Sequence, residues 1–304
     1  MKKLIAIIAG LLMGVAAFAA PNSYVDAYQL DADGNRISVL VEGQSLSVTN
    51  MPDGMTIARG LAPGFSAVSK FGAAPDFDED DGEVTVWDGA EDDAAWELMR
   101  YVYSTSADID SVSSSATNDI GTIEVQGLGA TSNLVVQTAT LNGQTRVALS
   151  TNLYRVFRIK NTGSSNFVGH VFAYPNTTLA SGVPATNNTI RAVVHPENNQ
   201  TEMAVYSVPF GKVAYLCSVY ASTAGANRES NYIIKLYARS PGGVFQLKHK
   251  EALADDGSSR TRHPFEVPLV FAAGTDLELT AEMTLGSATD AAIAGGFQIT
   301  LIDD

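Results

Sequence analysis

The chain has 304 residues, 45% of them hydrophobic, and its 33 acidic and 19 basic side chains give a formal net charge of −14. This composition is typical of a globular protein, and the acidic balance without a basic patch argues against nucleic acid and anionic membranes as partners. The length suggests about two compact units with appendages. A single cysteine, Cys217, excludes an internal disulfide and multi-cysteine zinc motifs, and we interpret it as a small strand residue and not as a nucleophile.

Residues 1–19 resemble a secretory signal. A basic start at Lys2 and Lys3 precedes a short apolar run that ends in Ala-Phe-Ala, with Pro21 soon after. The pattern predicts cleavage after Ala19 and a location outside the cytoplasm. Two alternatives stay open: an apolar helix that is retained and packs on a partner or lipid, or an upstream start codon that translation does not use.

Residues 20–106 are predicted to form a hairpin followed by an extended arm. The hairpin turns at Asp33-Gly34, a strong turn signal between two short apolar runs. The turn also resembles the start of an EF-hand loop, with oxygen-bearing side chains at the expected spacing: Asp31, Asp33, Asn35 and Glu42. Arg36 occupies the position where that loop needs glycine, so a plain turn is favoured.

The arm covers residues 50–90, where apolar alternation lapses and Gly, Pro and acidic residues accumulate. We expect it to lack a core of its own and to gain order by lying on a neighbour. Its acidic cluster at residues 76–83 could attract Ca²⁺, but Trp87 stands where a bidentate acid would be needed, so a solvated acidic loop is favoured. One short helix is predicted at residues 91–103.

Two antiparallel β-sandwich units are predicted next, at residues 107–195 and 196–304, which makes the fold class all-β. In the first unit, Asn142-Gly143 is a two-residue hairpin signal. In the second, jelly-roll-like unit, residues 277–285 alternate between apolar side chains and Glu or Thr. That period of two predicts a buried face with Leu279 and a solvent face with Glu278.

Several segments together resemble a family of phage virion structural proteins that is abundant in environmental, especially marine, sequences. They are Ala-Arg-Gly-Leu-Ala-Pro-Gly at 58–64, Lys-Phe-Gly at 70–72, Pro-Asp-Phe-Asp at 75–78, Val-Trp-Asp-Gly at 86–89, Gln-Gly-Leu at 126–128, Thr-Leu-Asn-Gly at 140–143, Tyr-Arg-Val at 154–156, Tyr-Ser-Val-Pro-Phe-Gly-Lys at 206–212, and Gly-Phe-Gln-Ile-Thr-Leu-Ile-Asp at 296–303. The resemblance covers about residues 56–304. It implies a non-enzymatic, β-rich component of the phage head or tail, located in the virion, with other virion proteins and further copies of itself as partners.

No catalytic, cofactor-binding or metal site is predicted. The four histidines, His170, His195, His249 and His263, are not at metal-ligand spacing in the sequence, and no nucleophile elbow, zinc-protease motif or phosphate-binding glycine loop is present. The alternative function is an exported β-sandwich module that binds a carbohydrate or cell-surface ligand. Aromatic side chains that would serve it are Tyr101, Tyr103, Tyr215, Tyr220 and Tyr237.

Overall fold

The computed structural model describes residues 28–30, 36–38, 52–92, 94–224, 230–255, 258–285 and 291–304. The chain divides into two compact units, Met1–Gly54 and Met55–Asp304. The predicted signal, residues 1–19, and four EF-hand-like positions lie outside the described residues: Asp31, Asp33, Asn35 and Glu42. In the first unit, β1 (Tyr28–Leu30) pairs antiparallel with β2 (Arg36–Ser38), as the predicted hairpin requires.

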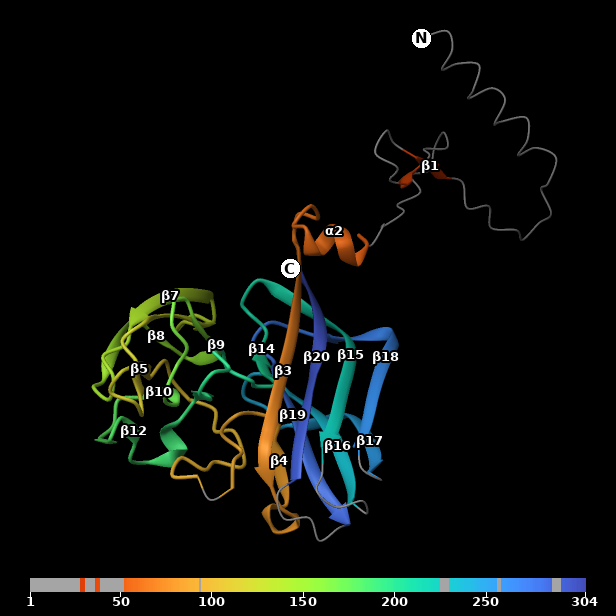
Figure 1. Ribbon diagram of the computed structural model, residues 1–304. Coiled ribbons are helices and arrows are strands. Elements are labelled where there is room, and N and C mark those ends of the chain that lie inside the picture. The colour runs from red at the N-terminus through yellow and green to blue at the C-terminus, as the bar shows by residue number, and fades with distance from the viewer. Residues whose placement is uncertain are drawn as a thin grey trace, which may run out of the picture. The chain divides into compact units, whose positions relative to one another are not determined.

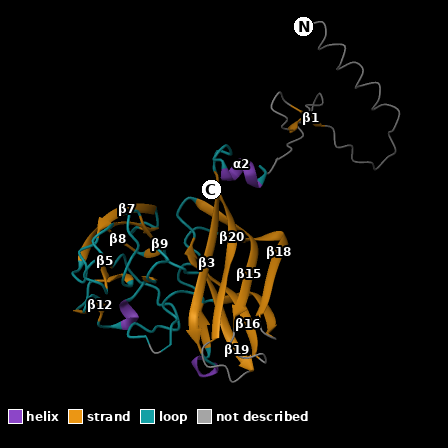
Figure 2. Ribbon diagram, viewed as in Figure 1, coloured by secondary structure: helices purple, strands orange, loops and turns teal. Residues whose placement is uncertain are grey.

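The second unit is almost entirely β-structure, as predicted (Figure 2). The helical elements of its described residues are one turn of α-helix and two 3₁₀ turns: α2 (Gly54–Ala58), η1 (Glu79–Asp81) and η2 (Asn187–Thr189). The helix predicted at residues 91–103 is wrong for the described part of that segment, which forms turns and loop. Its local backbone bonds are isolated turns such as Glu97 to Ala94, and other bonds run to distant residues: Thr85 donates to the Met99 carbonyl and Leu98 to that of Gly89.

Two large sheets form a sandwich (Figure 1). The first sheet has the order β18-β15-β20-β3, with bounds Ser258–Phe271, Lys212–Ala224, Ala291–Asp303 and Phe65–Phe77. The second has the order β14-β19-β16-β17, with bounds Val205–Ser207, Asp276–Leu285, Ser230–Arg239 and Gln246–Asp255. A further strand, β4 (Glu83–Thr85), also pairs with β19. All of these pairings are antiparallel.

The order in which the chain visits the two sheets is that of an eight-stranded jelly roll, provided that β4 and β14 count as one strand. Both lie on the same side of β19 and follow one another along it, since Thr85 pairs with Thr280 and Val205 pairs with Glu278. The chain therefore leaves this strand after β4 and rejoins it at β14. Residues 86–204 are an insertion into one jelly-roll strand.

This arrangement corrects the expected arm. Much of the segment forms strands within this chain and needs no neighbouring molecule to order it. Residues 65–77 form β3, which pairs with β20 over its whole length, and residues 83–85 form β4. The sequence gives little sign of β3 because its buried positions before the last residue are Lys70, Gly72 and Ala74. Phe77, at the end of the strand, is its one fully buried large apolar side chain, so a hydrophobicity pattern shows no period of two along β3.

The insertion contains two smaller sheets. One has the order β13-β10-β5-β8, with bounds Ala192–Val194, Val171–Pro175, Ile109–Ser114 and Val147–Leu153. The other has the order β7-β6-β9, with bounds Leu134–Thr140, Thr122–Leu128 and Arg155–Asn161. A two-stranded ribbon joins β11 (Leu179–Ala180) to β12 (Val183–Pro184). The insertion thus has a β-rich core of its own.

The predicted turn at Asn142-Gly143 is present, with Gly143 at φ 55° and Asn142 bridged to Thr145. The strands on either side do not continue as a ladder, because β7 and β8 belong to different sheets. The side chain of Gln137 on β7 instead bonds to the backbone N–H and C=O of Thr151 on β8. One side chain therefore replaces a ladder hydrogen-bond pair between these two sheets.

The predicted register of β19 is right for its apolar face, and Leu279 is fully buried. The solvent face is wrong for the first half of the strand, where Glu278 and Thr280 are also buried. Segment 99–101 covers them: the Thr85 hydroxyl donates to Glu278 at 2.5 Å, and Arg100 lies 3.3 Å from the same carboxylate. The first half of β19 is thus covered on both faces, although its sequence alternates between apolar and polar residues.

Candidate functional site: the neck and the junction of the insertion

The insertion leaves and returns through a neck in which the outgoing and incoming backbones pair with each other. Val86 donates to the Leu279 carbonyl at 2.9 Å, and Leu279 donates to that of Ala204 at 3.0 Å. Ala204 then donates to the Val86 carbonyl at 2.9 Å, so three backbone bonds link Val86, Leu279 and Ala204 to one another at the middle of β19. The divided strand thereby stays continuous in its hydrogen bonding.

Gly72 on β3 allows the sandwich to close over this neck. A Cβ atom at this position would lie 2.2 Å from the Val86 carbonyl oxygen and 2.5 Å from the Ala204 nitrogen. Both are backbone atoms that cannot swing aside, so only glycine fits here. The neighbouring Trp87 is fully buried, and its indole nitrogen donates to the Leu98 carbonyl at 3.1 Å.

A buried carboxylate completes the neck. The Asp88 side chain accepts a 2.7 Å hydrogen bond from the Glu202 backbone N–H, across the two paired chains. Burial raises the pKa of Asp88 well above its ordinary value, and the single backbone bond only partly opposes this rise.

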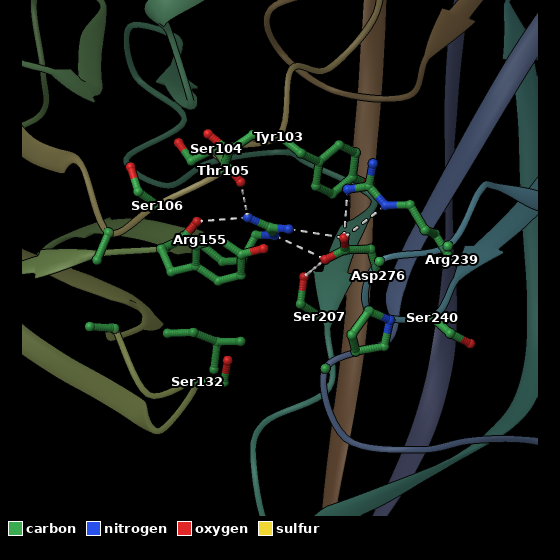
Figure 3. A pocket seen from close by; sticks show the side chains of 18 residues that line it. Tyr103, Ser104, Thr105, Ser106, Ser132, Arg155, Ser207, Arg239, Ser240 and Asp276 are labelled. Atoms are coloured by element: carbon green, nitrogen blue, oxygen red, sulfur yellow. Dashed lines mark hydrogen bonds and ion pairs between the residues drawn. The ribbon is translucent and has the colours of Figure 1, made fainter.

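A second buried carboxylate, Asp276 of β19, joins the insertion to the jelly roll (Figure 3). Arg155 of β9 binds it with two parallel hydrogen bonds of 2.9 and 3.0 Å, and Arg239 of β16 adds two more, of 3.2 and 2.7 Å. The Ser207 hydroxyl donates to the same carboxylate. Burial alone would raise the pKa of Asp276, but the bonds from Arg155, Ser207 and Arg239 outweigh it and hold the pKa below its ordinary value.

Lys70 of β3 is a second link between the two parts. Its ammonium donates to the Phe157 carbonyl of β9 at 2.7 Å, and no carboxylate bonds to it among the described residues. Burial, together with nearby Arg158, lowers the pKa of Lys70 to about 7. The amine therefore carries a proton at neutral pH only at a cost to the folded state.

A cavity of about 580 Å³ opens beside Asp276. It is lined from the insertion by residues such as Tyr103, Tyr154 and Arg155, and from the jelly roll by Arg239 and the turn at residues 240–243. Arg155 stacks on the Tyr154 ring at 3.8 Å and Arg239 on the Tyr103 ring at 4.5 Å. Two guanidiniums against one carboxylate leave a positive balance, so the cavity is suited to a polar or anionic ligand.

The structure gathers the four histidines into two groups that their sequence spacing does not show. His170 and His195 lie near Glu91, and His249 and His263 lie near Glu251. Each pair comes from different strands or loops, so only the fold brings its members together. Among the described residues, the histidine ring nitrogens that make hydrogen bonds do so with the Asp88 carbonyl and with Glu251, and not with a hydroxyl or thiol.

The other residues singled out in the sequence lie away from one another. Cys217 is half-buried at a bulge of β15, where its thiol contacts the Tyr215 carbonyl at 3.4 Å. Of the five tyrosines considered for ligand binding, Tyr101 is buried and the others are partly buried, so none offers a freely exposed ring. In the acidic segment, Asp81 turns back to accept the Asp78 N–H at 2.6 Å.

No protein-family model matches the chain, and no curated protein matches it either. The solved structures that are similar to it belong to a virus. A structure of infectious bursal disease virus, Gt strain, has 12% identity, covers 79% of this chain and 71% of that chain, and gives a TM-score of 0.19. The infectious bursal disease virus VP2 subviral particle has 10% identity, the same coverage and a TM-score of 0.21. At these values nothing about function passes to this chain.

Among the described residues, no helix has the length and apolarity that a membrane crossing requires.

Proposed function

We propose that this chain is a non-enzymatic structural protein of a phage virion, on the head or the tail, that works through contacts with copies of itself and other virion proteins. The observation that carries the proposal is the open edge of the jelly roll, formed by β17 and β18. Each of these strands ends its sheet, and large apolar side chains on and beside them face solvent: Val244, Leu247, Val267 and Val270, with 77, 48, 80 and 57% exposure.

An edge of this kind is a hazard for a protein that stays alone. Unpaired strands with exposed apolar side chains promote association, and soluble monomers protect such edges. The opposite edge of the first sheet, β3, is protected here by the neck and by β9 of the insertion. The open edge has no such cover from the described part of the chain, so we infer that another molecule covers it.

The charges favour a second copy of this chain as that molecule. The open edge carries four exposed basic side chains, Lys248, Lys250, Arg260 and Arg262, against one exposed acid among the described residues of the same strands, Glu266, in a chain whose net charge is −14. The corner between β3 and β4, at the other side of the jelly roll, carries exposed Glu79 and Asp80. A basic edge and an acidic corner on opposite sides support a head-to-tail contact, which generates rings or extended shells.

The family resemblance in the sequence points the same way, and jelly rolls are frequent in viral capsid domains. Because one fold serves many functions, the open edge and not the fold is the basis of the proposal. The proposed location is the virion. Secretion is the alternative if residues 1–19 are cleaved.

Sedimentation velocity of the full chain over a range of concentrations tests the proposal. We expect oligomers for the natural sequence and a monomer for the double variant Val267→Asp/Val270→Asp, which places two charges in the open edge. Val168→Asp is the matched control, because Val168 is 65% exposed on the insertion, away from this edge. A natural chain that stays monomeric at every concentration, or a double variant that still assembles, would overturn the proposal.

The junction cavity favours a second candidate function, binding of a carbohydrate or other cell-surface ligand. Cavities between two parts of a chain with a few convergent polar groups are common ligand sites, and Arg239 and Tyr154 lie at the wall of this one. A glycan array probed with the natural chain and with Tyr154→Ala tests this function. Binding that depends on Tyr154, by a chain that remains monomeric, would favour it over assembly.

A further inference from the structure

Two histidines and a glutamate meet where the two sheets of the jelly roll face each other at the open edge. His249 and Glu251 are two residues apart on β17, so their side chains leave the strand on the same face. His263 comes from β18, which belongs to the other sheet. One ligand atom from each of the three lies within 4.8 Å of the others.

The separations suit a small transition-metal ion. His249 Nε2 lies 3.4 Å from Glu251 Oε2, and the two imidazole rings are 4.5 Å apart between centroids. Ligand atoms about 2.0–2.1 Å from a tetrahedral zinc lie about 3.3 Å from one another, so the His249–Glu251 pair already has the required spacing. His263 supplies the third ligand atom, within 4.8 Å of the other two.

A second layer of contacts orients the carboxylate and one imidazole. The Thr261 hydroxyl donates to Glu251 Oε1 at 2.5 Å, which leaves Oε2 directed at His249. The edge of Phe265 packs on both rings, 5.5 Å from His249 and 4.9 Å from His263 between centroids. Such outer contacts fix ligand orientation at zinc sites and lower the cost of ordering the ligands on binding.

The other histidine group lacks these properties. His195 Nε2 is 3.0 Å from the Asp88 carbonyl, so this nitrogen carries the proton and donates it to the neck. His170 lies against the face of Trp96, with ring centroids 4.0 Å apart. Glu91 Oε2 is 3.5 Å from the same donating His195 nitrogen. This group is a polar packing arrangement of the neck and provides an internal control.

We propose that His249, Glu251 and His263 form a zinc site that joins the two sheets of the jelly roll at their open edge. Two imidazoles and one carboxylate are a common three-residue ligand set for zinc, with a fourth position left for water or for a donor from another molecule. The site would fasten β17 to β18, two strands of different sheets that no backbone ladder joins among the described residues. It does not depend on the proposed virion role, because it uses this chain alone.

The test uses the untagged full chain and ZnCl₂, since a polyhistidine tag would bind zinc itself. Isothermal titration is expected to show one equivalent of zinc. His249→Gln and His263→Gln keep a polar side chain but remove the ligand, and each is expected to weaken binding by more than about 100-fold. Thr261→Val is expected to weaken it about 10-fold, as loss of an outer-layer contact does.

His195→Gln is the matched control and is expected to leave the affinity and stoichiometry unchanged. Cobalt(II) provides an independent readout, because tetrahedral coordination gives intense visible absorption that octahedral coordination does not. Circular dichroism before metal addition establishes that each variant is folded. The proposal is overturned if the natural chain binds no zinc, or if His263→Gln binds zinc as tightly as the natural chain.

Discussion

The two edges of the jelly roll have opposite constructions. At the edge formed by β3, β4 and β14, the insertion covers the strands, and two buried contacts fasten it to the jelly roll: Asp276 with Arg155, and Lys70 with Phe157. A third buried contact, Asp88 with Glu202, joins the two chains of the neck to each other. At the edge formed by β17 and β18, valines and basic side chains face solvent. The first edge is closed within one chain, and the second is left for an intermolecular contact.

This difference separates the residues that determine stability from those that determine association. Buried charged groups at the closed edge are costly to disturb, because loss of one partner leaves the other without compensation in a low dielectric. Exposed apolar groups at the open edge contribute little to the free energy of unfolding of a monomer. Substitutions at the closed edge should therefore change the free energy of unfolding, and substitutions at the open edge should change the concentration at which the chain assembles.

Asp276→Asn is expected to have the largest effect. The variant leaves buried Arg155 and half-buried Arg239 beside each other without the carboxylate that binds both. Breaking a buried pair in this way costs about 3–5 kcal/mol in the free energy of unfolding. Urea denaturation measures the loss, and Glu266→Gln on the exposed face of β18 is the control, with a change below about 0.5 kcal/mol. Equal stability of the two variants would show that the junction does not hold the insertion.

Lys70→Met tests the closed edge through pH. The pKa of Lys70 is about 7 in the folded chain, below its ordinary value of 10.5, so between these values the unfolded chain binds a proton that the folded chain lacks. The stability of the natural chain should therefore rise, relative to that of Lys70→Met, by up to about 3 kcal/mol between pH 7 and pH 10. Denaturation of both proteins at several pH values measures the difference. A difference that stays constant with pH would mean that Lys70 is not desolvated.

Glu278→Lys tests the cover over β19. The sequence pattern alone makes this substitution nearly neutral, but Glu278 is 1% exposed and accepts a hydrogen bond from Thr85. A buried lysine at this position would lie beside Arg100, so we expect a loss of about 2–3 kcal/mol. Thr284→Lys, on an exposed position of the same strand, is the control and should be nearly neutral. If Glu278→Lys leaves the free energy of unfolding unchanged, Glu278 faces solvent as the sequence pattern predicts.

Val267→Asp is expected to have the smallest effect on stability and a large effect on association. The side chain is 80% exposed, so the free energy of unfolding should change by less than about 0.5 kcal/mol. The concentration at which the chain assembles should rise strongly, because a charge replaces an apolar contact at the centre of the open edge. Light scattering and urea denaturation on the same samples separate the two effects. A destabilised monomer would place Val267 in the core.

The sequence predicts the fold class and much of the jelly roll, because β16, β19 and β20 bury large apolar side chains at alternate positions, as at Leu236, Leu279 and Phe297. It does not predict β3, whose buried positions before Phe77 are Lys70, Gly72 and Ala74. It does not predict that β4 and β14 form one divided strand, since their six residues are separated by the whole insertion. The pattern of apolar residues within a strand does not predict which distant strand it pairs with.

The candidate sites were even less accessible to sequence analysis. His249 and His263 come from strands of different sheets, and the ion group at Asp276 draws Arg155 from the insertion and Arg239 from the jelly roll. Only the meeting of an alternating His-Lys-Glu pattern on β17 with a histidine on the next strand could have indicated the first group. No local signal marks the second, because charged residues of the insertion meet those of the jelly roll only after folding.

Hydrogen exchange measured by mass spectrometry on monomeric and assembled chain tests the contrast between the edges most directly. We expect peptides from β3, β4 and β14 to be protected from exchange already in the monomer, with little change in their exchange rates on assembly. Peptides from β17 and β18 should exchange quickly in the monomer and become protected in the oligomer. Protection gained at β3 and β4, with β17 and β18 unchanged, would contradict the assignment of the open edge as the assembly interface.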